Sequence, residues 1–113
     1  MQSYIETARR RQQQRKEHLH QLRQHGITQA KTAAQLLRKE FGASRIVLFG
    51  SMLNESTFHE TSDMDLAVWD LPPSDYIAAV ARLLQMSDFS IDLVEAESAR
   101  SYLQESIAQG LEL

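Results

Sequence analysis

The sequence predicts one α/β domain with a small β-sheet flanked by helices, preceded by a helical extension. The chain has 113 residues, a length that suits one compact domain. Stretches with helical periodicity alternate with short runs of β-branched and aromatic residues. Their order is helix, helix, strand, strand, helix, strand, helix, which is typical of an α/β fold. The chain has no cysteine, which excludes disulfides and cysteine-ligated zinc.

The first segment, residues 4–24, is rich in Gln and Arg and free of Gly and Pro, so its composition favours a helix. Its few apolar residues form only a weak stripe. Gly26 follows and predicts the end of this helix, with glycine in the left-handed cap position. We therefore expect a basic helical extension at residues 1–26 and a separate domain at residues 27–113.

The second helix is expected from Thr28, a fair N-cap, to about Phe41, with Gly42 ending it. Its apolar residues recur at spacings of three and four, which makes one apolar face. The run Arg45–Phe49 then predicts a short buried strand, because it is rich in branched and aromatic residues.

A polar connection at residues 52–62 leads to a second strand, Asp65–Trp69, which the following prolines terminate. A third helix is expected from Ser74, as N-cap, to about Met86. Its predicted inner side consists of four residues: Ile77, Val80, Ala81 and Leu84. A third strand is expected at Phe89–Val94, and a last helix at Glu97–Gln109 capped by Gly110.

Charge is distributed unevenly. Residues 1–45 hold ten Lys/Arg and three Asp/Glu, a balance of +7, and residues 46–113 hold two and twelve, a balance of −10. The basic front could bind nucleic-acid phosphates, dock on an acidic partner, or simply be a solvated helix. No aromatic residues interleave with the arginines, which argues against direct nucleic-acid binding by base stacking. The absence of a long apolar stretch or an apolar leader predicts a cytoplasmic protein without membrane insertion.

The chemistry is expected just after the first strand, at Gly50-Ser51. A glycine and a hydroxyl at the end of a strand let a nucleotide phosphate approach the backbone N–H groups closely. Gly-Ser is also a common turn, so this pair alone decides nothing.

Asp63 and Asp65 lie two residues apart at the start of a strand, so their carboxylates share one face. Two like charges this close favour a divalent cation between them, and oxygen ligands suit Mg²⁺ or Mn²⁺. The alternative is an unrelated loop acid and cap acid. Asp92, in the middle of the third strand, faces away from its apolar neighbours and would join the pair if the two strands are adjacent. Three acids could hold two metals for in-line displacement at phosphorus.

These residues resemble a known family. Gly50-Ser51, the pair Asp63 and Asp65, and the later Asp92 match the signature of DNA polymerase β-like nucleotidyltransferases. The short length and the ending ESIAQGLEL resemble the minimal nucleotidyltransferases (MNT), the antitoxin half of HEPN/MNT toxin–antitoxin pairs. The resemblance covers about residues 28–113.

The resemblance implies a mixed sheet flanked by helices and ATP bound through Gly50 and Ser51. It also implies two Mg²⁺ ions held by Asp63 and Asp65, with Asp92 sharing one metal and helping to deprotonate the attacking hydroxyl. For the MNT branch it implies transfer of AMP to a tyrosine of a HEPN ribonuclease toxin, which silences the toxin.

The sequence departs from the family where Met52-Leu53-Asn54-Glu55 replaces the usual Arg-Ala-Arg-Gly, so a basic group near the triphosphate is missing. Arg45 and Arg82 are candidates to supply it. Two other functions stay open: a degenerate site whose protein neutralises the toxin by binding alone, and an enzyme of the same fold acting on a small molecule such as an aminoglycoside.

Overall fold

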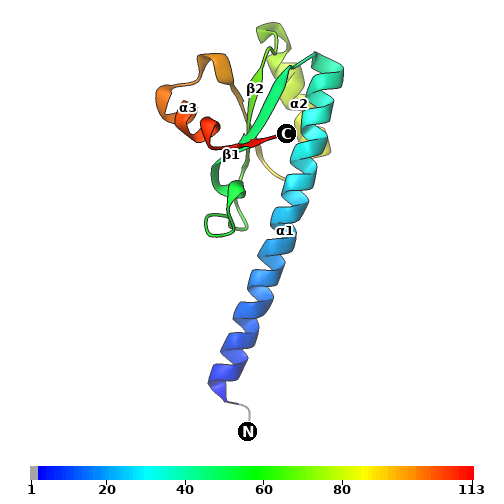
Figure 1. Cartoon of the computed structure of the whole chain (residues 1–113). Coiled ribbons are helices and arrows are strands. Elements are labelled where there is room, and N and C mark those ends of the chain that lie inside the picture. The colour runs from blue at the N-terminus through cyan, green and yellow to red at the C-terminus, as the bar shows by residue number, and fades with distance from the viewer. Residues whose placement is uncertain (1–2) are drawn as a thin grey trace.

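The computed structural model describes residues 3–113 and consists of a long helix, a four-stranded sheet and two shorter helices (Figure 1). The helices are α1 (Tyr4–Phe41), α2 (Tyr76–Met86) and α3 (Ser101–Ala108). The strands are β1 (Arg45–Phe49), β2 (Met64–Trp69), β3 (Ile91–Glu95) and β4 (Leu111–Glu112). Three 3-10 turns connect them: η1 (Gly50–Leu53), η2 (Pro73–Asp75) and η3 (Ala96–Ser98). The predicted α/β class is confirmed.

The helix α1 runs without a break through Gly26, so the predicted end of a first helix at this residue is wrong. Gly26 is buried, and a Cβ there would lie 2.7 Å from Cε of Met52. Gly26 therefore allows Met52 to approach the helix closely, and it does not form a left-handed cap. The helix ends where predicted, at Gly42, whose φ is +73° and whose N–H donates to the carbonyl of Arg38 at 3.1 Å. The division of the chain at residue 27 stays a prediction.

The sheet is mixed, in the order β3-β2-β1-β4. β1 is antiparallel to both β2 and β4, and β2 is parallel to β3. The first three strands lie at or within two residues of the predicted positions. The two-residue strand β4, which pairs with Val47 and Leu48 of β1, was not predicted. A run of two residues is too short to show the alternation of a strand.

The two faces of the sheet carry separate apolar clusters. On one face, alternate residues such as Ile46, Leu66 and Leu93 pack against buried residues of α1 and α2. On the other face, Val47 and Ala67 pack against α3. Because side chains alternate along a strand, Asp65 and Asp92 lie on the face of the second cluster.

The predicted inner side of α2 is wrong in part. Ile77 is 81% exposed and Leu84 is 54% exposed, whereas Ala79 and Leu83 are fully buried. Ser74 does not cap this helix, because a 3-10 turn at Pro73–Asp75 precedes it. The last helix is also shorter than predicted. It begins at Ser101, after the 3-10 turn at Ala96–Ser98, and ends at Ala108.

The N-terminal part of α1 projects beyond the rest of the chain, and the molecule measures 64 × 29 × 18 Å (Figure 1). Every residue from Tyr4 to His18 is exposed, whereas Leu19 and Leu22 pack against the core. Within residues 3–113, no helix is long and apolar enough to span a membrane.

Candidate active site

The candidate site begins where β1 passes into the turn η1. Phe49 of β1 pairs with Asp65 of β2, so Gly50 directly follows the residue opposite this aspartate. Gly50 has a φ of +83°, and a Cβ on it would overlap Oδ2 of Asp65. Both the backbone conformation and the close approach of the carboxylate therefore require glycine here.

The parallel pairing of β2 and β3 brings two of the three predicted carboxylates side by side. Asp65 is in register with Asp92, and both side chains point to the same face of the sheet. Ile91 and Leu93, the neighbours of Asp92, belong to the core on the opposite face. Asp63 lies one residue before β2 and is exposed.

The surroundings of Asp65 disfavour its charge. Partial burial, followed by repulsion from Asp92 and then from Asp63, raises the pKa of the Asp65 carboxyl to about 6. Each of these effects favours the neutral acid in the absence of a cation. A bound cation would attract the Asp65 carboxylate and so offset its repulsion from Asp92 and Asp63.

The donor set fits a hard divalent cation, because carboxylate oxygens are the ligands that Mg²⁺ and Mn²⁺ prefer. Within the described residues 3–113, no three acidic or histidine side chains are grouped tightly enough to hold a metal ion as they stand.

Ser51 is held by hydrogen bonds within the connection to β2. Its hydroxyl donates to Oγ of Ser62 at 3.0 Å, and the backbone N–H of His59 donates to the same oxygen at 3.0 Å. Ser62 is a buried polar residue, 6% exposed, for which the sequence alone predicts no role. A serine directly before an Asp-x-Asp pair was the available signal.

The two arginines considered as phosphate ligands lie elsewhere. Arg45 is at the opposite end of β1, where it pairs with Glu112 and stacks 4.2 Å from the centre of the Trp69 ring. Arg82 pairs with Glu40 of α1 at 2.8 Å. The arginine that contacts the segment after Ser51 is Arg23 of α1.

A mixed sheet flanked by helices, with a glycine-serine turn against Asp65, is the arrangement that the sequence resemblance implies for a nucleotidyltransferase of the polymerase β type. The family model described as Polymerase beta, Nucleotidyltransferase matches residues 31–113, and the chain belongs to this family. The resemblance found in the sequence is thereby confirmed. No protein of curated function matches the sequence closely enough to add to this assignment.

Solved structures of toxin–antitoxin complexes share the fold, and the matched chains are MNT antitoxins. The complex named MntA-HpeT, in a Tyr-to-Ala mutant, matches with 30% identity and a TM-score of 0.59, covering 74% of this chain and 69% of that chain. A toxin–antitoxin structure with AMP-PNP matches with 28% identity and a TM-score of 0.62, covering 74% and 70%. An AMPylated Shewanella oneidensis HEPN toxin in complex with its MNT antitoxin matches with 24% identity and a TM-score of 0.58, covering 77% and 70%.

Proposed function

We propose that this chain is a Mg²⁺-dependent nucleotidyltransferase that transfers AMP from ATP to a tyrosine of a HEPN toxin and thereby acts as its antitoxin. One observation carries the proposal: Asp65 and Asp92 lie in register on adjacent strands, Asp63 lies one residue before β2, and Gly50 lies against Asp65. Asp65 therefore lies against the turn Gly50–Leu53, which carries Ser51.

In the proposed reaction the tyrosine oxygen attacks the α-phosphorus of ATP. A new O–P bond forms, the bond to the β-phosphate oxygen breaks, and pyrophosphate leaves. Asp92, the more exposed of the two paired acids, accepts the tyrosine proton. Gly50 and Ser51 bind the phosphates through backbone N–H groups and the hydroxyl. Mg²⁺ held by Asp63, Asp65 and Asp92 would neutralise charge on the triphosphate and the leaving pyrophosphate.

The relatives support this choice of nucleotide and partner. One structure similar to this chain was crystallised with AMP-PNP, an ATP analogue. Another is an antitoxin bound to an AMPylated HEPN toxin. Another neighbour was crystallised as a variant with two Asp-to-Glu substitutions two positions apart, the spacing of Asp63 and Asp65 in this chain.

The test is the intact mass of a HEPN protein encoded beside this chain, after incubation with the chain, ATP and Mg²⁺. A gain of one or more AMP units is expected with the wild-type chain and none with Asp63→Asn. Asp63 is exposed, so this variant is expected to fold. Equal transfer by the variant would show that Asp63 is not a metal ligand.

A second function, neutralisation by binding alone, is favoured by the segment Met52–Glu55, which has Met52 and Asn54 where the resembled family usually has two arginines. It predicts no mass gain, a stable complex with the toxin, and full protection from the toxin by a chain lacking all three aspartates. Loss of protection in that triple variant would exclude it.

A further inference from the structure

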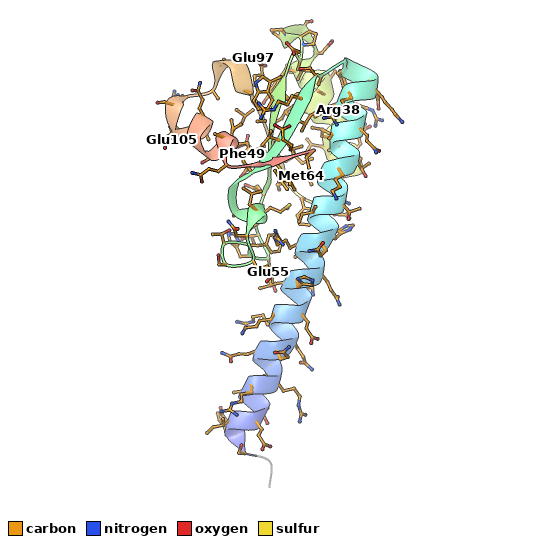
Figure 2. All side chains as sticks on the ribbon, viewed as in Figure 1. Arg38, Phe49, Glu55, Met64, Glu97 and Glu105 are labelled. Atoms are coloured by element: carbon orange, nitrogen blue, oxygen red, sulfur yellow. The ribbon has the colours of Figure 1, made fainter. Side chains whose placement is uncertain are left out.

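One face of the long helix α1 contacts the connection that carries the candidate nucleotide-binding turn. Nδ1 of His20 lies 2.7 Å from Oε1 of Glu55, and Gly26 is packed against the buried side chain of Met52. Arg23 lies between them on the same face. Figure 2 shows Glu55 beside the middle of α1, and Arg38 farther along the helix.

Arg23 makes the most specific of these contacts. Its Nε donates to the carbonyl of Met52 at 2.7 Å, and its second guanidinium nitrogen donates to the carbonyl of Leu53 at 2.5 Å. These are the last two carbonyls of the turn Gly50–Leu53. In the part of the chain that the structure describes, no carboxylate oxygen lies within 4.0 Å of this guanidinium, so its fork serves the two carbonyls alone.

Holding these carbonyls orients the peptide groups that follow Met52 and Leu53, because each peptide group is planar. The carbonyl of Ser51 itself accepts from Oγ1 of Thr57 at 2.8 Å, and its side chain is held by Ser62. Three successive carbonyls, from Ser51 to Leu53, are therefore engaged. Arg23 supplies two of the three bonds, from a position 29 residues earlier in the chain.

We infer that Arg23 is a positioning residue of the candidate nucleotide site, which holds the Gly50–Leu53 turn against Asp65 from outside the residues that the family model matches. The family model begins at residue 31, so the family assigns nothing to this arginine. The expected effect of Arg23 on nucleotide binding rests on the proposed function, whereas its effect on the conformation of the turn does not.

The test compares Arg23→Gln with Arg38→Gln in the full chain. Arg38 is a matched control on the same helix, because it also donates to a backbone carbonyl, that of Leu113, at 2.9 Å. Hydrogen exchange of the amides in residues 50–57 is measured without nucleotide. It is expected to accelerate about tenfold in Arg23→Gln and to stay within about twofold in Arg38→Gln. Binding of AMP-PNP with Mg²⁺ is expected to weaken about tenfold in the first variant only.

Arg23→Lys keeps a cation but loses the two-pronged fork, so it is expected to fall between Arg23→Gln and the wild type in both measurements. It also provides the measurement if Arg23→Gln does not fold. Unchanged exchange in both Arg23 variants, or equal acceleration in Arg38→Gln, overturns the inference. Absence of AMP-PNP binding by the wild-type chain, with faster exchange in Arg23→Gln, would refute the proposed function and leave the positioning role standing.

Discussion

Asp65 is half-buried between Gly50 and Asp92, so its carboxylate loses hydration and faces two like charges. Its pKa of about 6 lies above the ordinary value of 3.8. The folded state therefore binds the proton of Asp65 more tightly than the unfolded state does. The stability associated with this preference is fully present below about pH 3.8 and is lost as the pH rises through 6. At neutral pH this position makes an ionised carboxylate lower the stability of the fold, which supports a role for Asp65 as a ligand rather than a structural acid.

We expect Asp65→Asn to raise the free energy of unfolding by about 1 kcal/mol at pH 7.5 in metal-free buffer. The pKa shift alone corresponds to about 3 kcal/mol, which solvent screening of this half-exposed group reduces. The gain should shrink as the pH falls from 6 toward 4, because the wild-type acid becomes neutral. Urea unfolding at pH 7.5 and pH 5 measures this difference.

Asp88→Asn is the control of opposite sign. Hydrogen bonds from His25 and Gln29 hold the pKa of Asp88 below its ordinary value, so its removal is expected to destabilise the chain at pH 7.5. A destabilised Asp65→Asn variant at pH 7.5, or a gain that grows on acidification, would contradict this account of the site.

At the scale of elements, the sequence predicts strands better than helix faces. β1 and β2 were found because each is a short apolar run between turn residues. In α2, apolar residues surround most of the helix, so periodicity alone offers two stripes. The neighbouring elements decide that Ala79 and Leu83 are inside and that Ile77 is outside.

The residues of the candidate site were likewise predictable from the sequence only in part. Asp65 and Asp92 stand at strand positions where alternation alone gives the direction of the side chain. Asp63 lies one residue before β2. Arg23 could not be assigned to the site, because its partners lie 29 and 30 residues away and no local pattern encodes that contact. Gly26 has the local signal of a cap, but close packing against Met52 overrides it.

Two adjacent leucines in α2 test the observed orientation of this helix. Leu83→Ala is expected to lower the free energy of unfolding by about 2–4 kcal/mol, because the side chain is fully buried and its loss leaves a cavity. Leu84→Ala removes the same atoms from a side chain that is 54% exposed, and should cost less than about 1 kcal/mol. Urea unfolding of both variants gives the comparison. A larger loss in Leu84→Ala than in Leu83→Ala would mean that the helix packs through the face predicted from the sequence.

At the scale of the whole molecule, α1 joins two environments. From Leu19 onward its apolar residues pack on the domain, whereas residues 4–18 are exposed and carry five Lys/Arg and two Asp/Glu. A segment of this length is marginally helical by itself, so its helicity depends on continuity with the packed part. The basic end thus extends away from the acidic domain and is free to meet an acidic surface.

Two truncations separate the exposed part of α1 from the packed part. A chain lacking residues 1–14 is expected to match the full chain in thermal unfolding midpoint and in AMP-PNP binding, because those residues make no packed contact with the core among the described residues. A chain lacking residues 1–26 loses Leu19, Leu22 and the Arg23 bonds to the turn, which should cost about 3 kcal/mol or more and weaken nucleotide binding. If this shorter chain proved as stable as the full one, residues 27–113 would form an independent domain, and the part of α1 before residue 27 would not contribute to the site. A loss in both truncations would instead mean that the exposed arm contributes contacts of its own.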